Sequence, residues 1–203
     1  MSRIKQAMVS VLAIAFVGAF AAASASAHRF IEEGPKEVAN GEKIAGTSGI
    51  SELASEIDKV KITIVCKKDK FSGTLETGGK TKATITYEEC SLVGLSGCKV
   101  PNITAKVNDK LIENAGKEIE DEFEQENSET PFATIAIEVC TLKGTYKVTG
   151  TQKCALPKGK EFLVLHEIAC ATSGSSLKLG SEKATYKGTA SVEMASKHKW
   201  AVE

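Results

Sequence analysis

The sequence predicts an all-β protein, an antiparallel β-sandwich or barrel-like fold that is stapled by disulfides and preceded by a cleaved signal peptide. Three observations lead to this prediction. Apolar and polar residues alternate with a period of two along most of the chain, glycines separate the alternating stretches, and all six cysteines follow a hydrophobic N-terminal segment. Thr, Val and Ile favour strands, and short strands at regular spacing are typical of sandwiches and barrels.

Residues 1–27 have the organisation of a secretory signal peptide. Arg3 and Lys5 form a basic start, a long uncharged apolar stretch follows, and Ala25-Ser26-Ala27 is the small-x-small pattern that signal peptidase recognises. We therefore predict cleavage at the end of this segment and a secreted, extracellular protein. No later apolar run reaches the roughly 20 residues that a membrane span needs, so no span is expected once the signal is removed.

Composition limits the classes of function. The chain has 203 residues, of which 42% are hydrophobic, 26 are Lys or Arg and 26 are Asp or Glu. Loss of the signal removes Arg3 and Lys5 only, which leaves 24 basic and 26 acidic residues and a net charge of −2. Nucleic-acid binding usually requires a basic excess, so nucleic acid is not expected as a partner. Residues 44–203 are predicted to form a single β domain.

The expected strands are recognised by alternation in which every second residue is apolar. Glycines and polar residues punctuate these runs as turns. The predicted strand-forming stretches are 61–66, 82–87, 100–107, 132–140, 145–149, 162–170 and 184–194.

Two stretches interrupt the strand pattern. Residues 28–43 contain Gly34-Pro35 and Asn40-Gly41 and are expected to form a flexible N-terminal arm. Residues 118–129 hold seven acidic and no basic side chains. Calcium is one interpretation, but the Asp-x-Asp-x-Asp-Gly order of a calcium loop is missing. A solvated loop or short helix, with Ile119 and Phe123 as its buried side, is the prediction.

The cysteines predict three disulfides. An even number in an exported chain is typical of a disulfide framework. The closest spacing is eight residues, whereas zinc sites pair ligands two to four residues apart and thiol redox sites use Cys-x-x-Cys. The six residues are Cys66, Cys90, Cys98, Cys140, Cys154 and Cys170.

A local repeat bears on how the cysteines pair. Segments 83–94 and 133–144 are identical at seven of twelve positions at an offset of 50, which suggests a duplicated strand-turn unit. If Cys90 and Cys140 are equivalent, their partners lie in the same direction along the chain. Upstream partners give 66–90, 98–140 and 154–170, whereas downstream partners give 90–98, 140–154 and 66–170. The first set is preferred, because the seven residues between Cys90 and Cys98 contain two glycines, as a hairpin tip would, but the sequence alone leaves both sets open.

No catalytic residues and no cofactor are predicted. A Gly-x-Ser-x-Gly elbow and a glycine-rich phosphate loop are both missing from the sequence. One metal site is an alternative, because His28 would become the mature N-terminus and a terminal His chelates copper together with a second His. That second ligand would be His166 or His198, although Arg29 follows where copper oxygenases typically have Gly.

The chain resembles a group of exported proteins of high-GC Gram-positive (actinobacterial) soil bacteria. The resemblance implies secretion and a β-rich, disulfide-bearing body, and it carries no catalytic or ligand residues. It is loose but spans most of the mature chain, through the segments Ala27-His28-Arg29-Phe30, Val65-Cys66, Phe71-Ser72-Gly73-Thr74, Tyr87 to Cys90 with Gly94, Gly97-Cys98, Gly144 to Thr151, and Leu177 to Gly180 with Ala184 and Trp200.

Together these observations favour a noncatalytic extracellular or envelope-associated module that works by structural or binding contacts, with a cell-envelope or extracellular protein as a possible kind of partner. Two alternatives remain. One is a copper-binding protein or copper oxygenase that uses His28. The other is an inhibitor of extracellular enzymes, which would present a rigid exposed loop between cysteines, such as residues 91–97.

Overall fold

The computed structural model describes residues 28–34, 36–171 and 174–203, and the predicted signal peptide lies outside these residues. The described chain is all-β, as the sequence predicts. Its strands are β1 (Phe30–Glu32), β2 (Lys36–Glu37), β3 (Lys43–Ser48), β4 (Ser51–Ile57), β5 (Val60–Glu76), β6 (Lys80–Val93), β7 (Ile103–Glu113), β8 (Ile119–Gln125), β9 (Ala133–Ile137), β10 (Gly144–Thr149), β11 (Thr151–Ala155), β12 (Leu165–Cys170), β13 (Lys178–Leu179), β14 (Glu182–Lys183), β15 (Thr185–Met194) and β16 (Trp200–Val202).

Eight of these strands close into an antiparallel barrel. Around the barrel the order is β7-β6-β5-β3-β15-β12-β11-β8, and β8 pairs with β7 to complete the circle. Closure removes the exposed edges of a sheet. An eight-stranded barrel has an interior just wide enough to be filled by side chains or to hold one small ligand.

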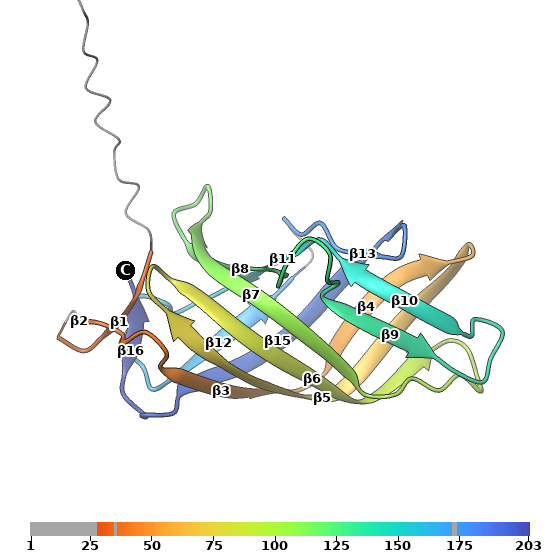
Figure 1. Ribbon diagram of the computed structural model, residues 1–203, viewed down its shortest axis with the longest axis horizontal. Coiled ribbons are helices and arrows are strands. Elements are labelled where there is room, and N and C mark those ends of the chain that lie inside the picture. Colours follow the sequence, from red (N-terminus) through yellow and green to blue (C-terminus); the bar gives the residue numbers. More distant parts are fainter. Residues whose placement is uncertain (1–27, 35, 172–173) are drawn as a thin grey trace, which may run out of the picture.

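The long strands β5 and β6 continue past the barrel into a second sheet region (Figure 1). There β5 pairs with β4, while β9, β10, β13 and β14 extend the sheet from β7. Strands β3 and β4 keep one register against β5, since Ser48 is paired with Asp69 and Ser51 with Cys66. They are therefore two halves of one long strand, interrupted at residues 49–50.

A small sheet of β16, β1 and β2 covers one end of the barrel and is called the cap here (Figure 1). The ring of Phe30 packs edge-on against Trp200, with centroids 5.7 Å apart. The β5–β6 turn docks on this sheet so closely that a Cβ at Gly79 would lie 2.1 Å from the carbonyl oxygen of His28. Because β1 pairs with β16, the cap joins the two ends of the described chain.

The cap corrects the prediction of a flexible arm over residues 28–43. This stretch contains β1, β2 and the start of β3, and its apolar residues Phe30, Ile31 and Val38 are buried. Its glycines mark tight turns: Gly41, for example, has φ +87°. Strand β1 pairs with β16 and β2, and the Gly41 turn is fixed on β5 because its N–H donates to the carbonyl of Leu75 at 2.8 Å.

The acidic stretch 118–129 also differs from its prediction. It forms strand β8 instead of a loop or short helix, and β8 pairs with both β7 and β11. Ile119 and Phe123 are buried as expected, but Asp121 between them is buried too. A carboxyl group at a core-facing position conceals the period of two in the sequence.

The disulfides join Cys66 to Cys90, Cys98 to Cys140 and Cys154 to Cys170, which is the set with upstream partners. The first and third each link residues directly opposite one another on neighbouring strands. The repeated segments share one local feature, because the residue before each equivalent cysteine has a positive φ: Glu89 at 55° and Val139 at 70°.

Candidate ligand cavity in the barrel

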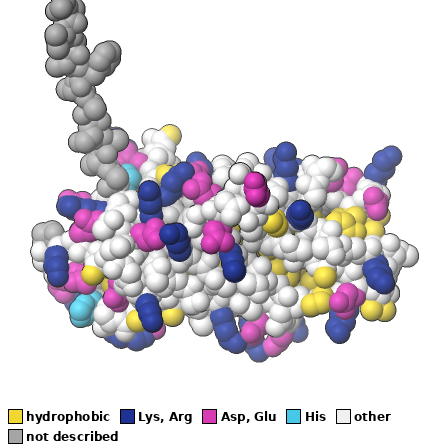
Figure 2. Space-filling model, viewed as in Figure 1, with side chains coloured by type: hydrophobic (Ala, Val, Ile, Leu, Met, Phe, Trp, Pro, Cys, Tyr) yellow, Lys and Arg dark blue, Asp and Glu magenta, His cyan; other side chains and the backbone are white. Residues whose placement is uncertain are grey.

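A partly open cavity of about 130 Å³ lies where the barrel passes into the second sheet region. Most of its wall is apolar, as is typical of small-molecule sites. Figure 2 shows the larger groups of exposed hydrophobic side chains in the half of the molecule that carries β9 and β10, while charged side chains are spread over both halves. Apolar residues that line the cavity include Ile64, Phe71, Val107, Phe123, Ile135 and Ile168.

A buried carboxyl group, that of Asp69 on β5, forms part of the wall. Asp69 is 5% exposed and accepts hydrogen bonds from the hydroxyls of Ser48 and Ser51, the second at 3.2 Å. These serines stand on either side of the interruption between β3 and β4. Burial raises the pKa of Asp69, and the two hydroxyls partly oppose that rise.

Asp69 points inward because the alternation of the strand changes phase. Along β5 the buried series runs through Ile64 and Cys66, then skips to Asp69 and Phe71, since Lys67 and Lys68 are both exposed. Strand β6 changes phase beside it, near Glu89 with its positive φ. A strict period of two would have placed Asp69 on the outside.

Two tyrosines stand beside Asp69. Tyr87 on β6 and Tyr186 on β15 pack edge-to-face, with ring centroids 6.2 Å apart. Burial and the Asp69 charge raise the pKa of Tyr186 to about 12, although hydrogen bonds with Tyr87 and Ser51 oppose the shift. A Cβ at Gly188 would lie only 2.9 Å from the Tyr186 hydroxyl, so glycine lets the ring fold back over its own strand.

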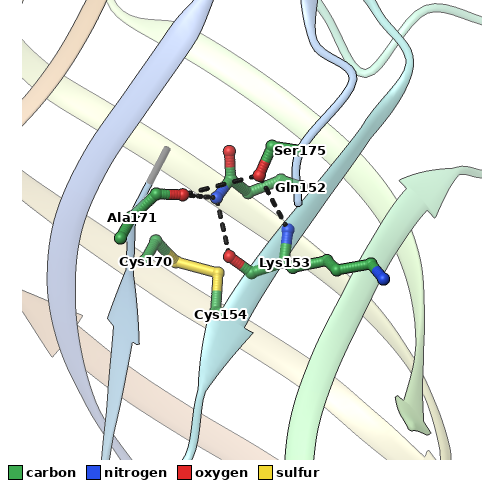
Figure 3. The surroundings of a disulfide bond; sticks show 6 residues. All are labelled: Gln152, Lys153, Cys154, Cys170, Ala171 and Ser175. Atoms are coloured by element: carbon green, nitrogen blue, oxygen red, sulfur yellow. Dashed lines mark hydrogen bonds between the residues drawn. A yellow bond between two sulfur atoms is a disulfide. The ribbon is translucent and has the colours of Figure 1, made fainter. Parts of the chain in front are cut away.

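Gln152 on β11 supplies a second polar group of the cavity wall (Figure 3). Its Nε2 donates to the carbonyls of Lys153 at 2.8 Å and Ala171 at 2.9 Å. These two acceptors fix the orientation of the amide, and Oε1 is buried without a hydrogen-bond partner. Strands β5 and β11 are four positions apart in both directions around the barrel, so Gln152 and Asp69 lie on opposite walls.

The wall of the cavity carries a negative charge. Among the described residues that line it, Asp69 is the one charged side chain, and no Lys, Arg or His is present. The serine hydroxyls and the Gln152 amide already donate their hydrogens within the protein. The Asp69 carboxylate and the Gln152 oxygen are left as acceptors for a ligand, beside the hydroxyls of Tyr87 and Tyr186, and the one negative charge disfavours anions.

A second acidic site, Asp109 on β7 and Asp121 on β8, lies inside the barrel but does not line the cavity. Burial raises the pKa of Asp109 to about 7, against hydrogen bonds from Thr81 and Asp121. Burial and the neighbouring Asp109 charge raise the pKa of Asp121 well above its usual range. Burial of two neighbouring carboxyl groups therefore favours protonation of at least one of them at neutral pH.

The three histidines of the copper alternative have separate surroundings. His166 is 1% exposed inside the barrel, where its Nε2 donates to the carbonyl of Trp200 at 2.8 Å. Burial lowers the pKa of His166, so its ring is neutral. His28 lies 3.2 Å from the carbonyl oxygen of Glu203, and His198 lies 3.4 Å from Glu32. No group of three or more metal-ligating side chains occurs in the part of the chain that the structure describes.

Residues 91–97, the loop considered for an inhibitor, comprise the end of β6 and a turn. The segment is fixed at both ends, because Cys90 and Cys98 belong to different disulfides. Val93 within it is 54% exposed, and Val139, next to the Cys98 partner Cys140, is 76% exposed. The backbone of Val139 has a left-handed conformation, with φ 70°, which is strained for a β-branched residue.

The site residues Asp69, Tyr87, Gln152 and Tyr186 were not identified from the sequence. They come from four strands, and only the closed barrel brings them together. Compared with known family models, curated proteins and solved structures, the chain matches none. Over the described residues, no helix is long and apolar enough to span a membrane. The cavity itself is thus the main guide to function.

Proposed function

We propose that this chain is an exported, noncatalytic binding protein whose barrel holds one small molecule with an apolar body. The observation that supports this most directly is the cavity of about 130 Å³, with its apolar wall and three buried polar residues, Ser51, Asp69 and Gln152. A concave, mostly apolar site with a few fixed polar groups is the usual form of a small-molecule site.

The cavity volume limits the size of the ligand. A dry cavity of about 150 Å³ lined by apolar side chains accommodates a benzene ring. The present cavity is of similar volume and partly open, so it suits a single ring or short chain with one polar substituent. Long-chain lipids are too large to fit inside it.

A noncatalytic role is supported by the contents of the cavity. Asp69, Ser48 and Ser51 line it, but His166 does not, and the Nε2–H of His166 is used by Trp200. The acid, base and nucleophile of a hydrolase would have to converge on one bound substrate. Here the histidine and the cavity belong to different parts of the barrel.

Export is supported by the three disulfides, which persist in oxidising compartments, and by the predicted signal over residues 1–27. The test is mass spectrometry of protein secreted from a host expressing the full chain. A mature chain that begins at His28 is expected, whereas intracellular protein that retains residue 1 would contradict export. The relationship to exported actinobacterial proteins stays a prediction.

Binding is tested with benzyl alcohol, a neutral ring of suitable size, titrated into the mature protein and followed by 1H–15N NMR. We expect saturable shifts at residues around the cavity. In the variant Ala105→Leu, whose larger side chain extends into the cavity from β7, these shifts should be lost. The control is Ala83→Leu, a buried position outside the cavity wall. Shifts that are absent, or unchanged in the Ala105 variant, would overturn the proposal.

A second candidate function, inhibition of an extracellular enzyme, is favoured by the loop at residues 91–97. The loop is held between two disulfides, contains the exposed Val93, and is accompanied by the exposed Val139 beside Cys140. Rigid loops bind with a low entropic cost. Assays against a panel of secreted proteases test this directly. Inhibition that is lost in Val139→Asp would support it, and the lack of any inhibition would exclude it for those enzymes.

A further inference from the structure

We infer that the cavity selects small organic amines, that is, monocations with an apolar body, over neutral or anionic molecules of the same size. This inference rests on the proposed binding function and specifies its ligand class. It depends on the juxtaposition of Asp69, two tyrosine rings and the free Gln152 oxygen around one apolar cavity.

The first argument is the uncompensated charge of Asp69. None of the ion pairs among the described residues includes it, and its two hydrogen-bond donors, Ser48 and Ser51, are neutral hydroxyls. A buried carboxylate without a counter-ion is costly. A ligand ammonium group would supply the missing positive charge, whereas a ligand carboxylate would add repulsion. The same ammonium would be favoured over a hydroxyl, because hydrogen bonds to charged groups are the stronger kind.

The second argument is the set of aromatic rings at the same end of the cavity. Phe71 lies two residues from Asp69 on β5, and Tyr87 is directly opposite Asp69 on β6. Tyr186 packs against Tyr87 from β15. Aromatic faces attract cations, and the attraction grows when the cation is desolvated. Asp69 and these rings thus favour the same type of ligand group.

The third argument is Oε1 of Gln152 on the opposite wall. The Gln152 side chain is 5% exposed, and its Nε2 is already bonded to two carbonyls. The remaining atom is an acceptor without a partner, and the residue lines the cavity. An unpaired buried acceptor is costly. A ligand with a second donor, such as an aryl hydroxyl, at the end distant from its ammonium group would satisfy it.

A purely structural role for Asp69 is the competing explanation. Its carboxylate connects Ser48 and Ser51 across the break between β3 and β4, and this alone would account for its burial. The variant Asp69→Asn separates the two roles. The amide keeps an oxygen that accepts a serine hydrogen bond but carries no charge.

The experiment compares benzylamine, benzyl alcohol and benzoate by isothermal titration calorimetry at pH 7. The three share one ring and differ in charge. With the natural protein we expect benzylamine to bind at least about tenfold more tightly than benzyl alcohol, as a charged hydrogen bond in a buried site requires, and benzoate not to bind. In Asp69→Asn the amine should lose this advantage, while the affinity for the alcohol stays within about twofold. Asp109→Asn removes a buried acid outside the cavity and should leave the ratio unchanged.

The outcomes separate the two levels of the proposal. Equal affinity for amine and alcohol would overturn the amine inference and leave the binding function intact. Failure of all three probes to bind would overturn both. If Asp69→Asn does not fold, the ranking of the three probes on the natural protein decides the inference alone. A further probe, 4-hydroxybenzylamine, should bind more tightly than benzylamine, and Gln152→Leu should abolish that gain.

Discussion

Two buried acidic sites lie in the same barrel and differ in what surrounds them. Asp69 adjoins an open space and is hydrogen-bonded by two serine hydroxyls. Asp109 and Asp121 do not line this cavity and rely on each other and on Thr81, with one oxygen of each left without a partner. The first arrangement leaves a negative charge available to a ligand. The second satisfies its charge internally by holding a proton.

The comparison teaches that burial of a carboxyl group does not by itself indicate a binding site. Both sites have a raised pKa for the same reason, which is desolvation. The available space and the donors already present decide whether the carboxyl recognises a ligand or controls stability. The predictions below separate these two roles, beginning with the largest expected effect.

Two of the disulfides differ in their position relative to the cavity: Cys154–Cys170 lies in its wall, and Cys98–Cys140 lies outside it. Strands β11 and β12 pair at only two positions, one of which is the Cys154–Cys170 pair in the cavity wall (Figure 3). Replacing both cysteines by Ala should lower the free energy of unfolding by about 3 kcal/mol and abolish ligand binding. The same change at Cys98 and Cys140 should cost about 4 kcal/mol, because the loop is longer, yet preserve binding. Urea denaturation and calorimetry measure both; binding that survives the first change would contradict this division.

The paired acids should make stability depend on pH. The native state holds protons on Asp109 and Asp121 to higher pH than an unfolded chain, whose aspartate pKa is near 3.8. Their contribution to stability is therefore fully present below about pH 4 and is lost as the pH rises through about 7. Asp109→Asn should flatten this dependence and raise stability at pH 8 by about 1–3 kcal/mol.

Chemical denaturation between pH 4.5 and 8 measures this effect. Asp58→Asn, on an exposed two-residue turn, is the matched control and should follow the natural protein. A natural protein that becomes more stable as the pH rises through 7, with no change on Asp109→Asn, would show that the pair does not share a proton.

Substitutions at two alanines test whether the space beside Ala105 is unfilled. Ala83 on β6 packs over Gly73 and does not line the cavity beside Asp69, whereas Ala105 on β7 does. Leu at position 83 should cost about 1–3 kcal/mol through overpacking. Leu at position 105 should be neutral or stabilising by up to about 1 kcal/mol, as cavity-filling changes are. Thermal unfolding ranks the two variants, and the reverse order would mean that the barrel is packed at Ala105.

The smallest effect is expected at Gly188. An alanine methyl there would meet the Tyr186 hydroxyl at 2.9 Å, so the ring must shift. Because Tyr186 is only half-buried, Gly188→Ala should cost about 1 kcal/mol of stability or less. The affinity for benzylamine should fall more than that for benzyl alcohol. An equal fall for both probes would separate Tyr186 from cation recognition.

Much of the fold could be predicted from the sequence, because the alternation of apolar and polar residues is a local pattern that identifies strands. The cysteines are few, which limits the ways in which they can pair. The site does not follow, because its residues depend on shifts of that period. The buried series on β5 passes from Cys66 to Asp69, and the partly buried residues of β6 that pack on the core pass from Tyr87 to Cys90. Strict alternation in the sequence continues from Cys66 to Lys68, which the structure exposes. Gln152 has no local signal at all, since its oxygen is left free because its Nε2 is bonded to the carbonyls of Lys153 and, distant in the sequence, Ala171.

The most direct test of the central claim, that the space beside Asp69 is a ligand site, is an isotope-filtered NOE measurement with bound benzylamine. We expect contacts from the ring protons to the methyl groups of Ile64 and Ile135, which line the cavity. No contacts are expected to Ile31 and Val202, which are buried in the cap. Contacts confined to the cap or to exposed Val139, or none at all, would contradict the claim.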